Sequence, residues 1–172
     1  MKIIKNSNVN FNTENDLEEY RVKTLLTKEH ETIVWINDFK IDEIFYDIGS
    51  NMGQYSLYSS INVGNTVYAF EPQIAIFKIL SKNLKKYKNI NKNNIALDSK
   101  PGKKIIYINK LSSTSTLSNI NKKSFFLKIK KILLQNNSNL PKNYLIKTSS
   151  IDEFFKKVDL TDVLLKIDVE GF

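Results

Sequence analysis

Short apolar runs and helical apolar spacing alternate along the first half of the chain. Residues 43–48 form a nearly continuous apolar and aromatic run closed by Gly49, whereas residues 54–61 carry apolar side chains at the three- to four-residue spacing of a helix. The same pair then repeats, with a β-branched and aromatic run at 66–70 and helical spacing over 74–84. The pattern predicts two successive units of strand, tight turn and helix.

Further elements are predicted on both sides of these units. A helix with Asp16 as its N-cap and Glu19 three residues later is expected to end near Trp35. A capping box at residues 150–153 predicts a second helix over 151–158. Further strands are predicted at 90–96, at 105–108, at 144–148 and within 162–171.

Strands that alternate with helices in this way predict an α/β fold, with a mainly parallel sheet and helices on both faces. At 172 residues the chain has room for one domain with one core. We expect a helical lead-in over residues 1–40 and the sheet-containing domain over residues 41–172. Residues 111–143 show no readable period.

The absence of cysteine and the single histidine, His30, exclude several kinds of chemistry. A chain without cysteine has no disulfide, thiolate nucleophile or cysteine-bound metal. One histidine cannot build a multi-histidine metal site or a histidine-based triad, so we expect no metal centre. The first residues contain no sustained apolar segment, and no run approaches the roughly 18 apolar residues of a membrane span. A soluble, cytoplasmic protein is therefore expected.

The formal net charge of +8 is unevenly placed along the chain. Residues 78–147 hold 17 lysines and one acid, Asp98. A nucleic-acid-binding module would normally use arginine forks and stacked aromatic residues, yet the chain's only arginine is Arg21. The same middle region is rich in asparagine and isoleucine, whose codons, like those of lysine, are A/T-rich. A compositional bias therefore explains the lysines at least as well, and we expect no nucleic-acid partner.

Two segments of the middle region each allow two interpretations. Residues 123–134 set phenylalanine, isoleucine and leucine against lysines, so this stretch either lies on an anionic membrane surface or packs its apolar face on its own domain. Packing on the domain is the interpretation that we favour. The hydroxyl-rich residues 112–116 either meet a polar substrate or form a loop, and the loop is favoured.

Acidic residues stand at the ends of three predicted strands. Asp47 ends the first strand, Glu71 the second, and Asp168 with Glu170 the last. In a parallel sheet, ligands bind beyond the carboxyl ends of the strands, where the strand order reverses. These acids are therefore candidate ligand-binding or catalytic residues.

The stretch FYDIGSNMGQYS narrows the kind of ligand. It lacks the Gly-Lys-Ser/Thr of a triphosphate loop and the G-x-G-x-x-G of a dinucleotide fingerprint, because Gly49 and Gly53 are spaced G-x-x-x-G. The carboxylate of Asp47 would repel a phosphate but suits an ammonium group. Glu71 follows Gly53 by 18 positions, where a carboxylate can accept hydrogen bonds from both ribose hydroxyls. A nucleoside with a cationic amino-acid arm, such as S-adenosylmethionine, fits this description.

Each piece also has a purely structural interpretation. Asp47 could be a turn residue, the glycines could serve close packing, and Glu71 before Pro72 could begin a helix at the surface. Their order and spacing together favour the ligand site.

From about Arg21 to Phe172 the chain resembles the FkbM-type S-adenosylmethionine-dependent methyltransferases. The resemblance lies in the segment from KEHETIVWINDF to FYDIGSNMGQYS, followed in order by VYAFEP, NNIALDSKPG, SSIDEFF and LLKIDVEGF. It implies a Rossmann-like class I sheet and a cofactor site of three parts. The implied site residues are Asp47, Gly49, Asn51 and Gly53 on the methionine side, Glu71 on the ribose, and Asn94 to Ala96, with Asn94 and Ala96 as the named positions, near the adenine.

The resemblance also implies an activity and a class of substrate. The expected reaction is methyl transfer from S-adenosylmethionine to a hydroxyl of a sugar, a glycan or a related small molecule. Asp168 is the candidate general base, with a structural or cofactor-contacting role as its alternative. Glu170 is expected to be structural.

One departure from the family concerns the end of the sequence. Such an enzyme would continue through further helices and three more strands, whereas this sequence ends at Phe172, directly after DVEG. The sheet is therefore expected to be incomplete, with the last strand at its edge. Besides an active methyltransferase, a non-catalytic fragment of one and a basic nucleic-acid- or membrane-surface-binding module stay open as alternatives.

Overall fold

The computed structural model describes residues 2–6, 9–108, 115–118, 143–156 and 161–169. The chain divides into two compact units, of which the first comprises Met1–Asn94 with Phe155–Asp168. The second comprises Ile95–Phe154 with Val169–Phe172. Each unit is described by itself.

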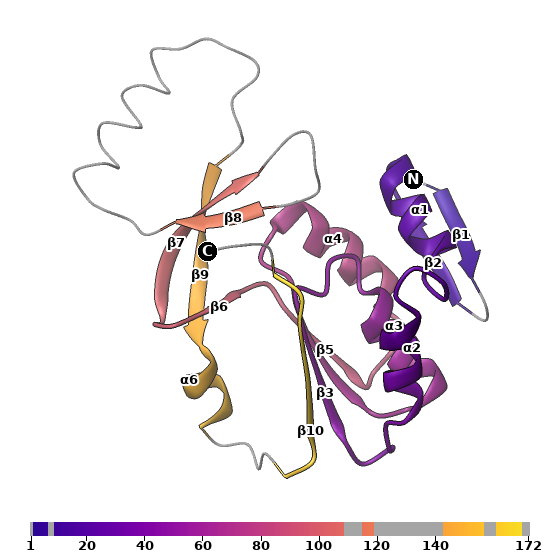
Figure 1. Cartoon of the computed structure of the whole chain (residues 1–172). Coiled ribbons are helices and arrows are strands. Elements are labelled where there is room, and N and C mark those ends of the chain that lie inside the picture. Colours follow the sequence, from indigo (N-terminus) through magenta and orange to yellow (C-terminus); the bar gives the residue numbers. More distant parts are fainter. Residues whose placement is uncertain (1, 7–8, 109–114, 119–142, 157–160, 170–172) are drawn as a thin grey trace. The chain divides into compact units, whose positions relative to one another are not determined.

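The first unit is built on a four-stranded parallel sheet with the order β10-β3-β4-β5 (Figure 1). The turn signals around the apolar runs set the strand ends close to where the sequence predicts them. The strands are β3 (Ile44–Ile48), β4 (Thr66–Phe70), β5 (Ile90–Asn93) and β10 (Val163–Ile167). The expected α/β fold with a mainly parallel sheet is confirmed.

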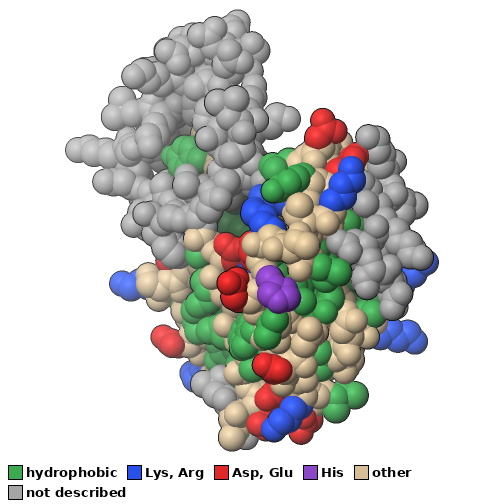
Figure 2. Space-filling model, turned by 45° about the vertical axis from the view of Figure 1, so that its right-hand side comes forward, with side chains coloured by type: hydrophobic (Ala, Val, Ile, Leu, Met, Phe, Trp, Pro, Cys, Tyr) green, Lys and Arg blue, Asp and Glu red, His purple; other side chains and the backbone are tan. Residues whose placement is uncertain are grey.

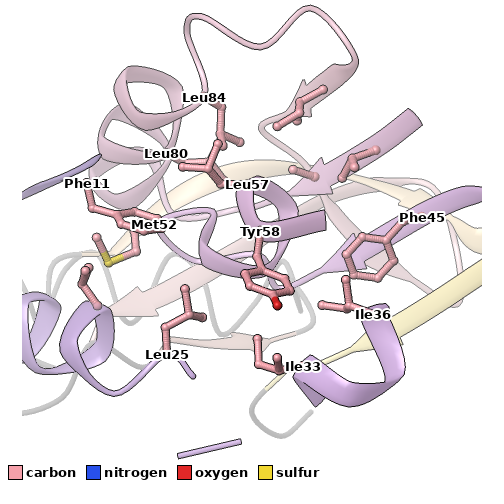
Figure 3. Packing of buried hydrophobic residues seen from close by; sticks show 14 of the residues in the cluster. Phe11, Leu25, Ile33, Ile36, Phe45, Met52, Leu57, Tyr58, Leu80 and Leu84 are labelled. Carbon is pink, nitrogen blue, oxygen red and sulfur yellow. The ribbon is translucent and has the colours of Figure 1, made fainter. Parts of the chain in front are cut away.

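Helices cover one face of this sheet and form its main core. Because side chains alternate along a strand, Phe45, Val67 and Ala69 face the helices and are fully buried. Figure 3 shows Leu57, Leu80 and other side chains of the helices packed in the same cluster. The helices are α1 (Asp16–Lys23), α2 (His30–Asn37), α3 (Gln54–Asn62) and α4 (Ile74–Asn83).

Aromatic side chains line the opposite face of the sheet. The rings of Tyr46 and Tyr68 stack with centroids 4.9 Å apart, and Phe70 stacks at 6.4 Å from Tyr46. Phe155, the last residue of the short helix α6 (Ile151–Phe155), packs on Tyr46 at 4.5 Å. Ser150 caps this helix, because its Oγ accepts the N–H of Glu153 at 3.0 Å, which is one of the two bonds of the predicted capping box.

The N-terminal region differs from its prediction in two ways. The first residues of the expected helical lead-in form a hairpin of β1 (Lys2–Asn6) and β2 (Val9–Thr13), and the single predicted helix is two helices, α1 and α2. Residues 24–29 between them form turns, and Thr24 Oγ1 donates to the Tyr20 carbonyl at 2.8 Å where α1 ends. The hairpin is fixed to α4, where Asn12 N–H donates to Asn83 Oδ1 at 2.7 Å.

The N-cap of α1 is Asn15, so the prediction of Asp16 is wrong by one residue. Asn15 has an extended backbone, and its Oδ1 accepts the N–H of Glu18 at 3.0 Å. The carboxylate of Glu18 reaches back to the N–H of Glu14 at 2.6 Å. The capping box therefore pairs Asn15 with Glu18, and Asp16 lies in the first helical turn, where its charge suits the helix dipole.

The second unit holds a smaller sheet with the order β6-β9-β7-β8. Strand β7 pairs antiparallel with β8 and β9, while β6 pairs parallel with β9. Ala96, Ile106 and Ile146 form its buried cluster. The strands are β6 (Ala96–Asp98), β7 (Gly102–Ile108), β8 (Ser115–Ser118) and β9 (Asn143–Ser150).

The single strand predicted over residues 90–96 is wrong, because these residues belong to two sheets. Strand β5 ends at Asn93, and β6 begins at Ala96 in the second unit. Between them the amide of Asn94 donates to the carbonyls of Glu71 at 2.7 Å and Pro72 at 3.1 Å. These bonds hold the backbone of the first unit at the point where the chain leaves its sheet.

Several predictions fall outside the described residues. These are the amphipathic stretch 123–134, most of the hydroxyl-rich segment 112–116, and Glu170. In the part of the chain that is described, no helix combines the length and hydropathy of a membrane span.

Candidate ligand site at the strand ends

The loop after β3 has a backbone that selects its residue types. Gly49, Asn51 and Gly53 all have positive φ angles, of 81°, 50° and 87°. Glycine meets no steric penalty there, and asparagine tolerates this region better than other side chains do. The N–H groups of Gly49 and Ser50 both donate to the Phe70 carbonyl, at 3.0 and 2.9 Å, which fixes the loop against the end of β4.

Gly53 has a second constraint, from packing. A Cβ at this position would lie 3.1 Å from the side chain of Leu84, closer than ordinary contact allows. Helix α3 begins at the next residue, so its N-terminal turn lies directly beside the loop. The G-x-x-x-G spacing is thus explained by backbone conformation and close packing, in addition to any role in ligand binding.

Asp47 is fully buried at the end of β3 and only half satisfied. Its Oδ2 accepts the hydroxyl of Ser56 at 2.6 Å, whereas its Oδ1 has no hydrogen-bond partner in the structure. Burial raises the pKa of Asp47, and the nearby charge of Lys166 partly opposes that effect. A buried acceptor without a donor costs about 1–3 kcal/mol. A ligand that brings an N–H donor to Oδ1 would recover that cost.

Glu71 is buried at the end of β4 and holds the same loop. Its Oε2 accepts the N–H of Asn51 at 3.1 Å, and its Oε1 accepts the N–H of Gln73 at 2.7 Å. Burial, with a smaller effect of the neighbouring charge of Asp47, raises the pKa of Glu71 to about 7 despite these bonds. Each carboxylate oxygen keeps lone-pair capacity for one more donor, such as a hydroxyl.

Lys166 also lies at the site, although the sequence analysis expected no role for it. It is the register partner of Asp47 in the parallel pair of β10 with β3. Its Nζ lies 3.1 Å from Asp168 Oδ2 and 4.9 Å from the centroid of the Tyr55 ring, whose hydroxyl donates to Glu29 Oε2 at 2.7 Å.

Asp168 lies where the sequence predicts it, directly after β10 and beside the loop. Its N–H donates to the Ile48 carbonyl at 2.9 Å, which extends the pairing of the two strands by one residue. Its side chain is 60% exposed, in contrast to the buried Asp47 and Glu71. The structure therefore brings Asp47, Glu71 and Asp168 to the same edge of one sheet.

The two residues predicted near the adenine lie in different units. Asn94 is at the end of β5 and is bonded to the backbone of Glu71, so it adjoins the site. Ala96 belongs to the second unit, where it packs with Ile106 and Ile146. Its role stays a prediction.

The charges of the described side chains indicate which kind of ligand the site can bind. Four carboxylates (Glu29, Asp47, Glu71 and Asp168) act on one another or on shared neighbours, against the two cations Lys166 and Arg21. Such an arrangement favours a ligand with a net positive charge that also carries hydroxyl or N–H donors.

Comparison with known protein families shows which family the chain belongs to. Residues 47–172 match the family model described as the methyltransferase FkbM domain. The chain belongs to the FkbM methyltransferase family. The match begins at Asp47 and covers the loop, Glu71 and Asp168, so the family expected from the sequence motifs is confirmed. A search of curated proteins gave no significant match to this FkbM chain.

Solved structures resemble the FkbM chain over part of its length. TYW2 from P. horikoshii in complex with MeSAdo is 17% identical, with a TM-score of 0.43, and the match covers 55% of this chain and 35% of that one. TYW2 from M. jannaschii in complex with AdoMet is 19% identical, with a TM-score of 0.42 and coverages of 53% and 41%. Precorrin-6y C5,15-methyltransferase from Geobacter metallireducens is 21% identical, with a TM-score of 0.36 and coverages of 48% and 42%. The matches thus span 35–42% of the length of these proteins.

Proposed function

We propose that this FkbM protein is an S-adenosylmethionine-dependent methyltransferase that methylates a hydroxyl group of a sugar, a glycan or a related small molecule. Membership of a methyltransferase family supports the reaction and the cofactor. The observation that carries the proposal at the level of atoms is the buried, unpartnered Oδ1 of Asp47 beside the left-handed loop. The fit of the described residues to the cofactor rests on that atom, because it lacks the N–H donor that an ammonium group would bring.

The proposed binding roles follow from the chemistry of each residue. Asp47 accepts hydrogen bonds from the ammonium of the amino-acid arm, and Glu71 accepts them from the ribose hydroxyls. Gly49, Asn51 and Gly53 shape the loop between these two carboxylates. Asn94 and Ala96 are the proposed neighbours of the adenine.

Asp168 is the proposed general base. When bound, S-adenosylmethionine would supply a methyl carbon on a cationic sulfur that can leave as a neutral thioether. A sugar hydroxyl is a weak nucleophile until its proton is removed, and the exposed carboxylate of Asp168 can accept that proton. Its contact with Lys166 holds the carboxylate beside the loop. Orienting the hydroxyl in line with the breaking bond supplies the larger share of the rate gain.

The activity is tested by transfer of a labelled methyl group to a panel of monosaccharides, glycan fragments and hydroxylated lactones. We expect transfer to at least one acceptor, and we expect Asp168→Asn to lower kcat by about 100-fold, the usual contribution of a general base. Asp162→Asn is the matched control, because Asp162 is an exposed acid just before the same strand. Unchanged kcat in Asp168→Asn would remove Asp168 from the mechanism. Absence of transfer by a protein that binds the cofactor would favour the non-catalytic alternative.

A further inference from the structure

Asp47 and Lys166 are oppositely charged neighbours, and the proposed function gives a ligand-binding role to Asp47 alone. They are register partners in adjacent parallel strands, so their side chains leave the sheet on the same face. Neighbouring strands lie about 4.8 Å apart, which sets the two side chains next to each other. The side chain of Lys166 is only 11% exposed, an uncommon degree of burial for a lysine.

The surroundings of Lys166 satisfy part of its hydrogen-bonding capacity. An ammonium has three N–H donors, and Asp168 accepts one of them at 3.1 Å. The Tyr55 ring lies 4.9 Å from Nζ and offers its electron-rich face, without an acceptor atom at hydrogen-bond distance. Asp47 has the complementary deficit, since its Oδ1 lacks a donor. The pair therefore presents an unfilled acceptor beside a cation with donors to spare.

A zwitterion fills both deficits at once. An α-amino acid carries its ammonium and its carboxylate on one carbon, so a protein must meet the two charges with groups that lie side by side. We propose that Lys166 binds the carboxylate of the ligand's amino-acid arm while Asp47 binds its ammonium. This inference rests on the proposed function, since it assumes a ligand with that arm. It makes Lys166 a residue that selects for a free α-carboxylate.

Arg21 is the other cation of the site, and it belongs to a different part of it. The Arg21 carbonyl accepts a hydrogen bond from Gln54 Nε2 at 2.8 Å, and its charge acts on Glu71, the proposed ribose ligand. Lys166 instead shares its register position with Asp47. The carboxylate of the arm is therefore assigned to Lys166.

The test uses two ligands and calorimetric titration of the full chain. S-adenosylhomocysteine carries the complete arm, and its decarboxylated analogue, the aminopropylthio derivative of adenosine, keeps the ammonium but lacks the carboxylate. We expect the wild type to bind the decarboxylated analogue about 10- to 100-fold more weakly, the usual effect of losing a charged hydrogen bond. We expect Lys166→Met to lose a similar factor for S-adenosylhomocysteine and to bind the two ligands with nearly equal affinity. Lys92→Met is the matched control, because Lys92 is an exposed lysine on β5 of the same sheet.

Each other outcome has a definite meaning. Equal affinity of the wild type for the two ligands would overturn the proposal, and this measurement needs no variant to fold. Tighter binding of S-adenosylhomocysteine by Lys166→Met would also overturn it, since Lys166 would then compete with the ligand's cation. If the folded wild type binds neither ligand, the proposed function fails, and the assignment of Lys166 fails with it. Binding of both ligands without discrimination refutes the assignment of Lys166 alone.

Discussion

Two buried carboxylates define the site at the scale of single residues, and they differ in how they are satisfied. Both oxygens of Glu71 accept a backbone N–H group, whereas Asp47 has one oxygen with a hydroxyl donor and one with none. Burial raises the pKa of both groups. Glu71 therefore has a role in the unliganded fold, while the free oxygen of Asp47 is explained best by a ligand.

The pKa of Glu71 predicts how the stability of the protein depends on pH. Burial raises this pKa from 4.5 to about 7, so between these values the native state keeps a proton that the unfolded state has released. The free energy of unfolding should therefore fall as pH rises through this window. Glu71→Gln cannot titrate, so the wild type should lose on the order of 3 kcal/mol relative to this variant between pH 4.5 and 7. Urea denaturation at several pH values measures the difference, and a difference that does not change with pH would contradict the raised pKa.

Some of these residues could be predicted from the sequence, and one could not. Asp47 and Glu71 stand next to clear strand and turn signals, and the structure has them at strand ends. Lys166 entered the site only when the pairing of β10 with β3 was known. That pairing joins segments more than 100 residues apart, and no local pattern specifies its register.

Elements were predictable where local signals agree. Strand β4 and helix α4 begin at the residues that the apolar pattern and the flanking turns predict. The lead-in helix and the strand at 90–96 were wrong because the chain turns within each of these segments. Thr24 bonds to the backbone at the end of α1, and Asn94 holds the chain where β5 has ended. Periodicity shows which residues are buried, but it does not show these interruptions.

The corrected start of α1 gives a prediction at the scale of the element. Asn15 is the N-cap, so Asn15→Ala should lower the free energy of unfolding by about 1 kcal/mol. Asp16→Ala is the matched control and should change it by less than about 0.5 kcal/mol, since this residue makes only a favourable contribution to the helix dipole. Urea denaturation of both variants decides, and a larger loss for Asp16→Ala would restore the original assignment.

At the scale of the whole molecule, the absence of a nucleic-acid partner stays a prediction. On the face shown in Figure 2, acidic and basic side chains are interspersed among apolar ones, so the described atoms of that face form no continuous basic surface. Nucleic-acid backbones are bound by such surfaces.

The lead-in helices α1 and α2 contribute Val22 and Ile36 to the core that includes Phe45 of the sheet. The lead-in helices and the sheet thus share one core, and the domain boundary expected at residue 40 stays a prediction.

The central claim is that the strand-end site binds S-adenosylmethionine through Asp47. Calorimetric titration of the full chain with S-adenosylhomocysteine, compared between the wild type and Asp47→Ala, tests it most directly. Asp42→Ala is the control, because Asp42 is an exposed acid just before β3 and its removal changes the net charge equally. We expect the wild type and Asp42→Ala to bind alike and Asp47→Ala to bind more weakly by about 1–3 kcal/mol. No binding by the folded wild type, or wild-type affinity in a folded Asp47→Ala variant, would contradict the claim.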